Sequence, residues 1–294
     1  MEVGRNLVNE MSNEDTARLA NLAMRLRRNV VEMIGIGKAG HLGGSCSIAE
    51  VVAVLYFKKM HFDPQDIKNP DRDRLVLSKG HAVLIQYAAL VELGVIPRAE
   101  LAKLKTIGGM LQGHPDMEQT PGIEAVTGSL GQGLSIGLGM ALAMRLDSRK
   151  NRIYVIIGDG ELAEGQLWEA AMATAAYNVD TLTAIVDRNR IQATGPTAEV
   201  LDIPNIERKW EAMGWMVFTV DGHDVSSIFD GLERAESVKK RPTVIVANTV
   251  KGKGISFAED TAAFHNSVLT KEQYEQALAE LDQQIAASKI LSRR

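Results

Sequence analysis

The sequence has little of several residue types and patterns that mark particular classes of protein. It has one cysteine, Cys46, which excludes an internal disulfide and indicates a reducing compartment. Its basic residues are scattered, and a net charge of −4 argues against a nucleic-acid or anionic-membrane partner. No apolar run reaches the roughly eighteen residues that a membrane helix needs. Residues 1–15 lack the charged-then-apolar pattern of a signal peptide, so we expect a cytoplasmic protein.

What the sequence does contain is an alternation of short apolar runs with segments of helical periodicity. Runs such as "RIYVIIG" and "LTAIV" are continuously apolar, which is typical of parallel strands covered on both faces. No internal repeat or linker interrupts the 294 residues. The sequence therefore predicts one α/β domain over 1–294, with a mostly parallel sheet sandwiched by helices. A C-terminal helix is expected over about 270–294, opened by a capping box of Thr270 and Gln273.

Three local expectations concern glycine-rich or capped segments. "KAGHLGGSCS" is expected to be a loop, and Ser47 to cap a helix that follows it. Gly133, Gly137 and Ala141, spaced by four, form a small helix face suited to close packing, with a subunit contact as one option. Gly131, Gly133 and Gly137 form a weak dinucleotide-binding fingerprint, but that fingerprint needs a strand directly before it, and "GIEAVTGSL" is a poor one.

Two neighbouring apolar runs each end in an oxygen-bearing side chain. The first ends in Gly158-Asp159-Gly160, and the second leads to Asn189 after one helix-length segment. Because successive parallel strands end at one edge of a sheet, Asp159 and Asn189 are expected to share a crevice. One carboxylate and one amide suit Mg²⁺, which fills its octahedron with substrate phosphates and waters. The pattern predicts a magnesium–diphosphate site, against the simpler interpretation of a tight turn.

Three histidines, His41, His81 and His114, each follow a glycine in a polar or glycine-rich loop. Loops held on a rigid sheet often carry function, so these side chains are candidates for a site and not for structural roles alone. They could contact a sugar's oxygens and a developing alkoxide. His61 is expected to be at the surface or in the core, and His223 is expected to be structural.

"GDGELAEGQLWEA…IVDRNRI" resembles the thiamine diphosphate motif, a Gly-Asp-Gly followed by Asn at the end of the next strand. The segments "KAGHLGGS", "RLVLSKGH", "LQGHPD", "TGSLGQGLSIGLGMALA", "DGHD" and "VKGKGISF" follow in the order found in transketolases. Over nearly its whole length the chain is similar to the N-terminal, diphosphate-binding half of a transketolase. The resemblance implies the thiamine-diphosphate-binding fold.

The resemblance also implies roles for particular residues. Mg²⁺ would be held by Asp159, Asn189 and the main-chain carbonyl of Ile191. Thiamine diphosphate would be contacted by His81, Gly128, Ser129, Leu130, Gly158, Gly160 and His265, as well as by Asp159 and Asn189. The catalytic set would be His41, His114, His265 and Glu164, with Glu164 near the partner interface. The family usually has Gly after the last histidine, and this chain has Asn266, which bears on its substrate contacts.

A transketolase also needs a pyrimidine-binding domain that supplies an activating glutamate, and the resemblance covers only the other half. It therefore implies one subunit of a split transketolase that pairs with a C-terminal subunit, as a heterotetramer. The reaction would move a two-carbon glycolaldehyde unit from a ketose phosphate to an aldose acceptor. Two alternatives are the α subunit of another thiamine-dependent enzyme, such as a 2-oxo acid dehydrogenase or synthase, and a non-catalytic partner subunit.

Overall fold

The computed structural model describes residues 11–291. The helices are α1 (Asn13–Ile34), α2 (Leu42–Cys46), α3 (Ala49–Val54), α4 (Val83–Glu92), α5 (Gly133–Leu146), α6 (Gly165–Ala176), α7 (Thr197–Val200), α8 (Ile206–Ala212), α9 (Val225–Ser237) and α10 (Lys271–Leu291). The strands are β1 (Ala39–Gly40), β2 (Arg74–Leu77), β3 (Ile153–Gly158), β4 (Leu182–Arg188), β5 (Ile191–Gln192), β6 (Gly195–Pro196), β7 (Met216–Asp221), β8 (Thr243–Asn248) and β9 (Ser267–Val268). Among these helices none combines the length and the apolar content needed to cross a membrane.

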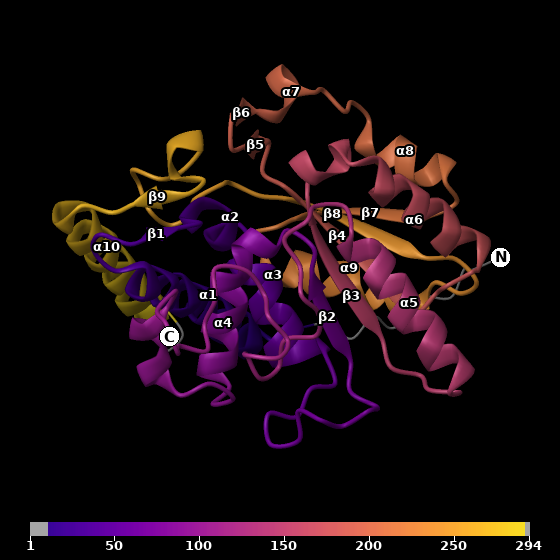
Figure 1. Ribbon diagram of the computed structural model, residues 1–294, viewed down its shortest axis with the longest axis horizontal. Helices are drawn as coiled ribbons and strands as arrows, with labels where there is room; N and C mark the ends of the chain where they lie inside the picture. The colour runs from indigo at the N-terminus through magenta and orange to yellow at the C-terminus, as the bar shows by residue number, and fades with distance from the viewer. Residues whose placement is uncertain (1–10, 292–294) are drawn as a thin grey trace.

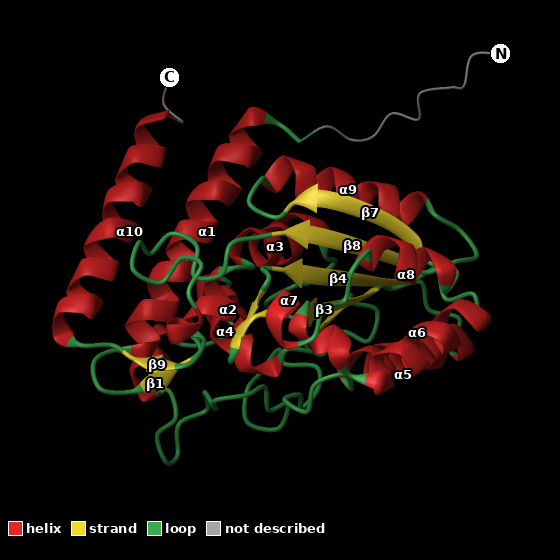
Figure 2. Cartoon of the chain, turned by 90° about the horizontal axis from the view of Figure 1, so that it is seen from above, coloured by secondary structure: helices red, strands yellow, loops and turns green. Residues whose placement is uncertain are grey.

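A five-stranded sheet in the order β2-β3-β4-β8-β7 forms the centre of the fold, and all its pairs are parallel (Figure 1). Side chains along each strand alternate between two apolar cores, as the pleat requires. In β3, Tyr154 and Ile156 join the core beneath α1, α3, α4 and α9, while Val155 and Ile157 join the core beneath α5, α6 and α8. The predicted sheet covered on both faces is confirmed (Figure 2).

Side chains cap the first turns of α1 and α10. The Ser12 hydroxyl accepts a hydrogen bond from the Asp15 backbone N–H at 3.1 Å and so caps α1. Thr270 and Gln273 exchange hydrogen bonds of 3.2 and 3.0 Å, which is the capping box at the start of α10. Helix α10 lies along α1, with Leu281 fully buried (Figures 1 and 2). Residues 292–294 of the expected C-terminal helix lie outside the described residues.

The expected loop at residues 38–47 and the expected Ser47 cap are wrong. Part of the segment pairs as β1 with β9, and part forms α2. A Cβ on Gly43 would lie 2.9 Å from Lys251 Cγ, so close packing explains this glycine. Helix α3 begins after Ile48 without a side-chain cap. The Ser47 hydroxyl instead donates to Asp187 Oδ2 at 2.7 Å, because a hydrogen bond to a buried carboxylate contributes more than a helix cap does.

The small face of α5 packs inside the fold, so the option of a subunit contact there is wrong. A Cβ on Gly133 would lie 2.4 Å from Ser78 Cβ, and one on Gly137 would lie 2.6 Å from Val155 Cγ2. Ala141, the third member of this face, is 1% exposed. The glycines let α5 approach β2 and β3 closely, which sets the position of the loop before α5.

Candidate active site

The carboxyl ends of β3 and β4 meet at one edge of the sheet, as their sequences predict. Gly158 pairs in register with Asp187, so the residues after each strand, Asp159 and Asn189, lie at the same edge. One Asp159 oxygen accepts a hydrogen bond from the Gly160 N–H at 2.9 Å, and the other accepts from the Arg190 N–H. The carboxylate therefore ties the two strand-end loops together.

Asn189 presents an amide oxygen to the same region. Its Nδ2 donates to Asp187 Oδ2 at 2.7 Å, which orients the amide so that Oδ1 accepts from the Ile191 N–H at 3.1 Å. The carbonyl oxygen of Ile191 lies 2.7 Å from Lys251 Nζ. A carboxylate, an amide oxygen and a main-chain carbonyl thus come from the ends of β3 and β4 into one place.

These groups line a cavity of about 380 Å³, which we call the central cavity. Its walls are Gly44, Lys79, His81, Leu130, Gly158, Asp159, Gly160, Glu161, Ala163, Glu164, Asn189, Ile191, Gln192, Ala193, Val200, Leu201, Lys251 and His265. Most of the residues that the sequence singled out are among them, from His81 to His265. The carboxyl edge of a parallel sheet is where ligands bind in open α/β folds.

Two buried lysines, Lys79 and Lys251, form the cationic wall of the central cavity. Lys79 Nζ donates to Asp187 Oδ2 at 2.6 Å and to the Gly44 carbonyl at 2.7 Å. Lys251 Nζ contacts His265 Nδ1 at 3.0 Å as well as the Ile191 carbonyl. Both are 2% exposed, which is rare for lysine. No sequence pattern singled them out, although each lies beside a glycine close after a strand.

The electrostatics of the central cavity favour a bound cation beside Asp159. Burial, with the Asp187 charge as the second cause, raises the pKa of the Asp159 carboxyl to about 6. Burial, with the Lys79 charge second, lowers the pKa of Lys251 to about 8. A divalent cation next to Asp159 would relieve the cost of ionising it, and an anionic group would do the same for the lysines. The donor set therefore fits a metal bound together with a polyanion.

Four histidines gather at this edge from four separate loops. The ring centroid of His41 lies 5.1 Å from that of His81, 6.0 Å from that of His114 and 5.6 Å from that of His265. Burial is the main cause that lowers the pKa of His41 to about 4, of His81 to about 2 and of His265 to about 3, and it also lowers the pKa of His114. The cluster is therefore neutral at pH 7 and can both donate and accept hydrogen bonds.

Several predicted residues lie outside the wall of the central cavity or at its rim. His41 and His114 do not line the central cavity, but their rings lie in the histidine cluster beside His81. Ser129 does not line the cavity either and is exposed. Gly128 leaves room for His114, because a Cβ there would lie 2.9 Å from His114 Cδ2. Glu164 is an exposed residue at the rim, just before α6.

Glu161 is a buried carboxylate that sequence patterns did not single out. It accepts hydrogen bonds from the Gly131 N–H at 2.8 Å, from the Gly158 N–H at 3.1 Å and from the Ser78 hydroxyl. One side chain therefore connects the end of β3, the residue after β2 and the loop before α5. These hydrogen bonds hold the glycine-rich segments around the central cavity in place.

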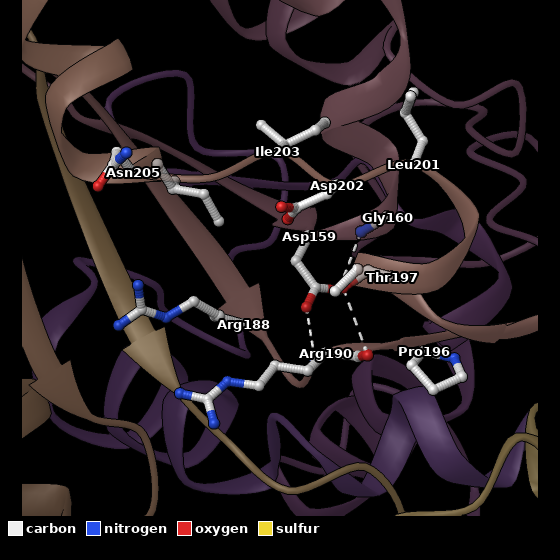
Figure 3. A pocket seen from close by; sticks show the side chains of 12 residues that line it. Asp159, Gly160, Arg188, Arg190, Pro196, Thr197, Leu201, Asp202, Ile203 and Asn205 are labelled. Atoms are coloured by element: carbon white, nitrogen blue, oxygen red, sulfur yellow. Dashed lines mark hydrogen bonds between the residues drawn. The ribbon is translucent and has the colours of Figure 1, made fainter.

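A second cavity of about 390 Å³ shares Asp159, Gly160 and Leu201 with the central cavity (Figure 3). Arg188 and Arg190 lie on one side of it and Pro196 on the other. Arg188 is already paired with Glu207 at 2.6 Å and with Asn248 at 2.7 Å. Because this second cavity lacks Asn189, the Ile191 carbonyl and the histidines, we place the candidate site in the central cavity.

Comparison with known proteins agrees with this geometry. Residues 19–287 match the family model described as the thiamine diphosphate binding domain of transketolase. The chain is 47% identical to the 6-deoxy-6-sulfo-D-fructose transketolase subunit SqwG of Clostridium sp. (strain MSTE9), covering 90% of this chain and 97% of that protein. It is 42% identical to one subunit of the apulose-4-phosphate transketolase of Phocaeicola vulgatus, covering 88% of this chain and 92% of that protein.

Longer relatives match over less than half of their own length. Human transketolase is 40% identical, with 92% of this chain and 43% of that protein covered. A transketolase variant from Pichia stipitis superposes with a TM-score of 0.83 at 28% identity, covering 94% of this chain and 45% of that one. The chain thus corresponds in length to the separate subunits and in fold to one part of the longer enzymes.

Proposed function

This chain belongs to the transketolase family, and from that membership and the central cavity we propose how it acts as one subunit of a split transketolase. The observation that carries the proposal is the meeting of Asp159, Asn189 and the Ile191 carbonyl beside two buried lysines. The relatives named as transketolase subunits do not favour the alternative of a 2-oxo acid dehydrogenase subunit.

In this proposal the central cavity holds Mg²⁺ and thiamine diphosphate. Asp159 Oδ, Asn189 Oδ1 and the Ile191 carbonyl would bind the metal, which would hold the diphosphate beside them. Lys251 and the Gly160 backbone would face the diphosphate. When bound, the cofactor supplies a nucleophilic carbon that attacks ketones and carries a two-carbon unit. The chain's own residues anchor the diphosphate end and keep water out.

The histidine cluster would orient the sugar. We assign His41 and His114 to substrate hydroxyls, His81 to the cofactor and His265 to both. Because the four rings are neutral at pH 7, each can donate to one oxygen while accepting from another. Such preorganised donors stabilise an oxygen on which negative charge develops. Asn266, in place of the family's usual glycine, would adjust the His265 loop and hence substrate contacts.

The substrates we propose are ketoses and aldoses with a terminal anionic group. Two similar subunits are named for substrates of this kind, a sulfonated fructose and apulose 4-phosphate. The donor would be a ketose phosphate or sulfonate, cleaved between its second and third carbons. The glycolaldehyde unit would pass to an aldose acceptor.

The partner would be a separate pyrimidine-binding subunit that supplies the activating glutamate. Val200 and Leu201, on the wall of the central cavity, are 47% and 56% exposed and would be covered by that subunit. Glu164 lies at the same rim and would face the contact. Two copies of each chain would form a heterotetramer, in the reducing cytoplasm that the single buried cysteine suits.

Activity of the mixed subunits tests this proposal. The purified chain is combined with a pyrimidine-binding transketolase subunit, thiamine diphosphate, Mg²⁺ and a ketose phosphate with an aldose acceptor. We expect products altered by two carbons, and we expect none when Asp159→Ala replaces the wild-type chain, because the variant lacks the charged metal ligand. Absence of transfer with a partner that binds the chain would overturn the proposal.

A further inference from the structure

His223 connects a buried ion pair to the segment that carries Lys251. Its Nε2 accepts a hydrogen bond from the Val250 N–H at 2.8 Å, so this nitrogen carries no proton. The proton is therefore on Nδ1, which lies 3.1 Å from Glu50 Oε2 and donates to it. The two contacts fix the tautomer and the plane of the ring.

The far end of this connection is rigid. Glu50 accepts two hydrogen bonds from Arg27, both of 2.6 Å, and the two side chains are 9% and 3% exposed. Arg27 Nε also donates to the Cys46 carbonyl at 3.1 Å, which joins the pair to α2. Burial alone would raise the pKa of Glu50, but the Arg27 charge and the His223 and Arg27 hydrogen bonds outweigh it and lower the pKa to about 2. The carboxylate thus remains a fixed acceptor for His223.

The near end of the connection lies directly before Lys251. The N–H groups on either side of Lys251 are both held, that of Val250 by His223 and that of Gly252 by the Gly43 carbonyl at 3.0 Å. Gly252 has φ of 76°, and a Cβ there would lie 2.1 Å from the Ala258 carbonyl oxygen. Lys251 therefore projects into the central cavity from a segment with two fixed amides and little freedom between them.

We propose that His223 is a positioning residue, which holds the Val250 amide so that the Lys251 ammonium stays at the Ile191 carbonyl and faces the diphosphate. The hydrogen bonds from Arg27 to Glu50, from His223 to Glu50 and from Val250 to His223 thereby fix the segment before Lys251 to α1 and α3. The hydrogen-bond partners of His223 are Glu50, Val250 and Asp221, and none of the three lines the central cavity, so we expect its effect to pass through Lys251. The cofactor arm of the inference rests on the proposed function, while the structural arm does not.

The structural test uses two variants, each of which keeps one of the two ring contacts of His223, either that with Glu50 or that with the Val250 N–H. Asparagine puts its amide near the place of Nδ1, and glutamine puts its amide near the place of Nε2. His223→Gln can still accept from the Val250 N–H, whereas His223→Asn can contact only Glu50. Amide hydrogen exchange on the full, cofactor-free chain should show the peptide around residues 248–254 opening about fivefold faster in H223N than in H223Q. Equal protection in both variants and the wild type would contradict the proposal.

The cofactor arm measures thiamine diphosphate affinity at saturating Mg²⁺ in the assembled subunit pair. H223N should weaken binding about tenfold, as loss of an outer hydrogen-bond partner does in metal sites, and H223Q should restore most of that loss. Lys251→Met should weaken binding at least as much, and adding H223N to K251M should weaken it little further, because both act on one contact. Lys253→Met, two residues away with a side chain that is 39% exposed, is the matched control and should bind as the wild type does.

The outcomes separate this inference from the proposed function. Additive losses in H223N and K251M, or wild-type affinity in H223N, would overturn the positioning role while leaving cofactor binding intact. A wild-type pair that binds no thiamine diphosphate would overturn the proposed function, and the hydrogen-exchange comparison would still decide the role of His223. A general fall in thermal stability of H223Q and H223N alike, with no difference at 248–254, would show that His223 is only structural.

Discussion

The ionised form of the Asp159 carboxyl is destabilised by its surroundings in the fold, and a bound cation would stabilise it. It is 7% exposed, its donors are two backbone N–H groups, and the ionised Asp187 is nearby. Asp187 itself keeps its charge because Lys79 and three hydroxyl or amide donors surround it. The two carboxylates at neighbouring strand ends therefore differ in role. The charge of Asp187 is balanced within the protein, whereas Asp159 has no cationic partner of this kind within residues 11–291 and is available to bind a ligand.

This difference predicts how the stability of the cofactor-free chain changes with pH. The pKa of Asp159 rises from 3.8 to about 6 in the folded state, so its contribution to stability is full below pH 3.8 and is lost as pH rises through about 6. A shift of this size corresponds to at most about 3 kcal/mol. Compared with Asp159→Asn, the wild type should therefore lose up to that much stability between about pH 4 and pH 7.

Urea denaturation of both proteins at the two pH values measures this difference. The asparagine variant has no titrating group at residue 159, so it cancels the pH dependence of all other residues. If the stability gap between the two proteins is the same at both pH values, Asp159 ionises normally in the fold and the electrostatic argument for a cation there is wrong.

Residue-level prediction succeeded where backbone topology alone decides the outcome. Asp159 and Asn189 end successive parallel strands, and the sheet brings them together as expected. Lys79 and Lys251 could not be found in the same way, because the sequence does not show whether a lysine is buried. Burial of these two depends on the packing of loops that are distant in the sequence. The role of Ser47 was mistaken for a related reason, since its hydroxyl serves Asp187, 140 residues away.

At the scale of elements, α5 shows how small residues set the distance between layers. Gly137 faces β3 at a separation that excludes a side chain, whereas a Cβ on Gly139 would meet nothing within 4 Å. The spacing of the glycines predicted close packing, but it could not say which surface the helix packs on. That choice follows from the sheet, whose Val155 side chain fills the space beside Gly137.

The two glycines provide a matched pair of substitutions in one helix. Gly137→Ala should destabilise the chain by about 2 kcal/mol, because the added methyl group overpacks the contact with Val155. Gly139→Ala should instead stabilise it by about 0.5–1 kcal/mol, since alanine favours the helix and has room. Denaturant midpoints of the two variants measure both values. A stabilising Gly137→Ala would show that α5 does not pack on β3 as closely as described.

Across residues 11–291, helices cover both faces of a parallel sheet whose carboxyl edge lines the candidate site. The order of elements and the parallel sheet were predictable because apolar runs alternate with helical patterns along the chain. The strand order, with β8 between β4 and β7, was not predictable, because it depends on which crossovers the packed helices allow. His41, His81 and His114 were predicted from their polar or glycine-rich loops and His265 from the family resemblance, but only the fold shows that the four rings meet.

The central claim is that this chain provides half of a transketolase active site and a second subunit provides the rest. The most direct test is a continuous-variation experiment, in which the molar fraction of the chain is varied at constant total protein with cofactor, Mg²⁺ and sugar substrates in excess. We predict no two-carbon transfer at either end and a maximum where the two subunits are present in equal amounts. Transfer that persists undiminished with this chain alone would contradict the claim.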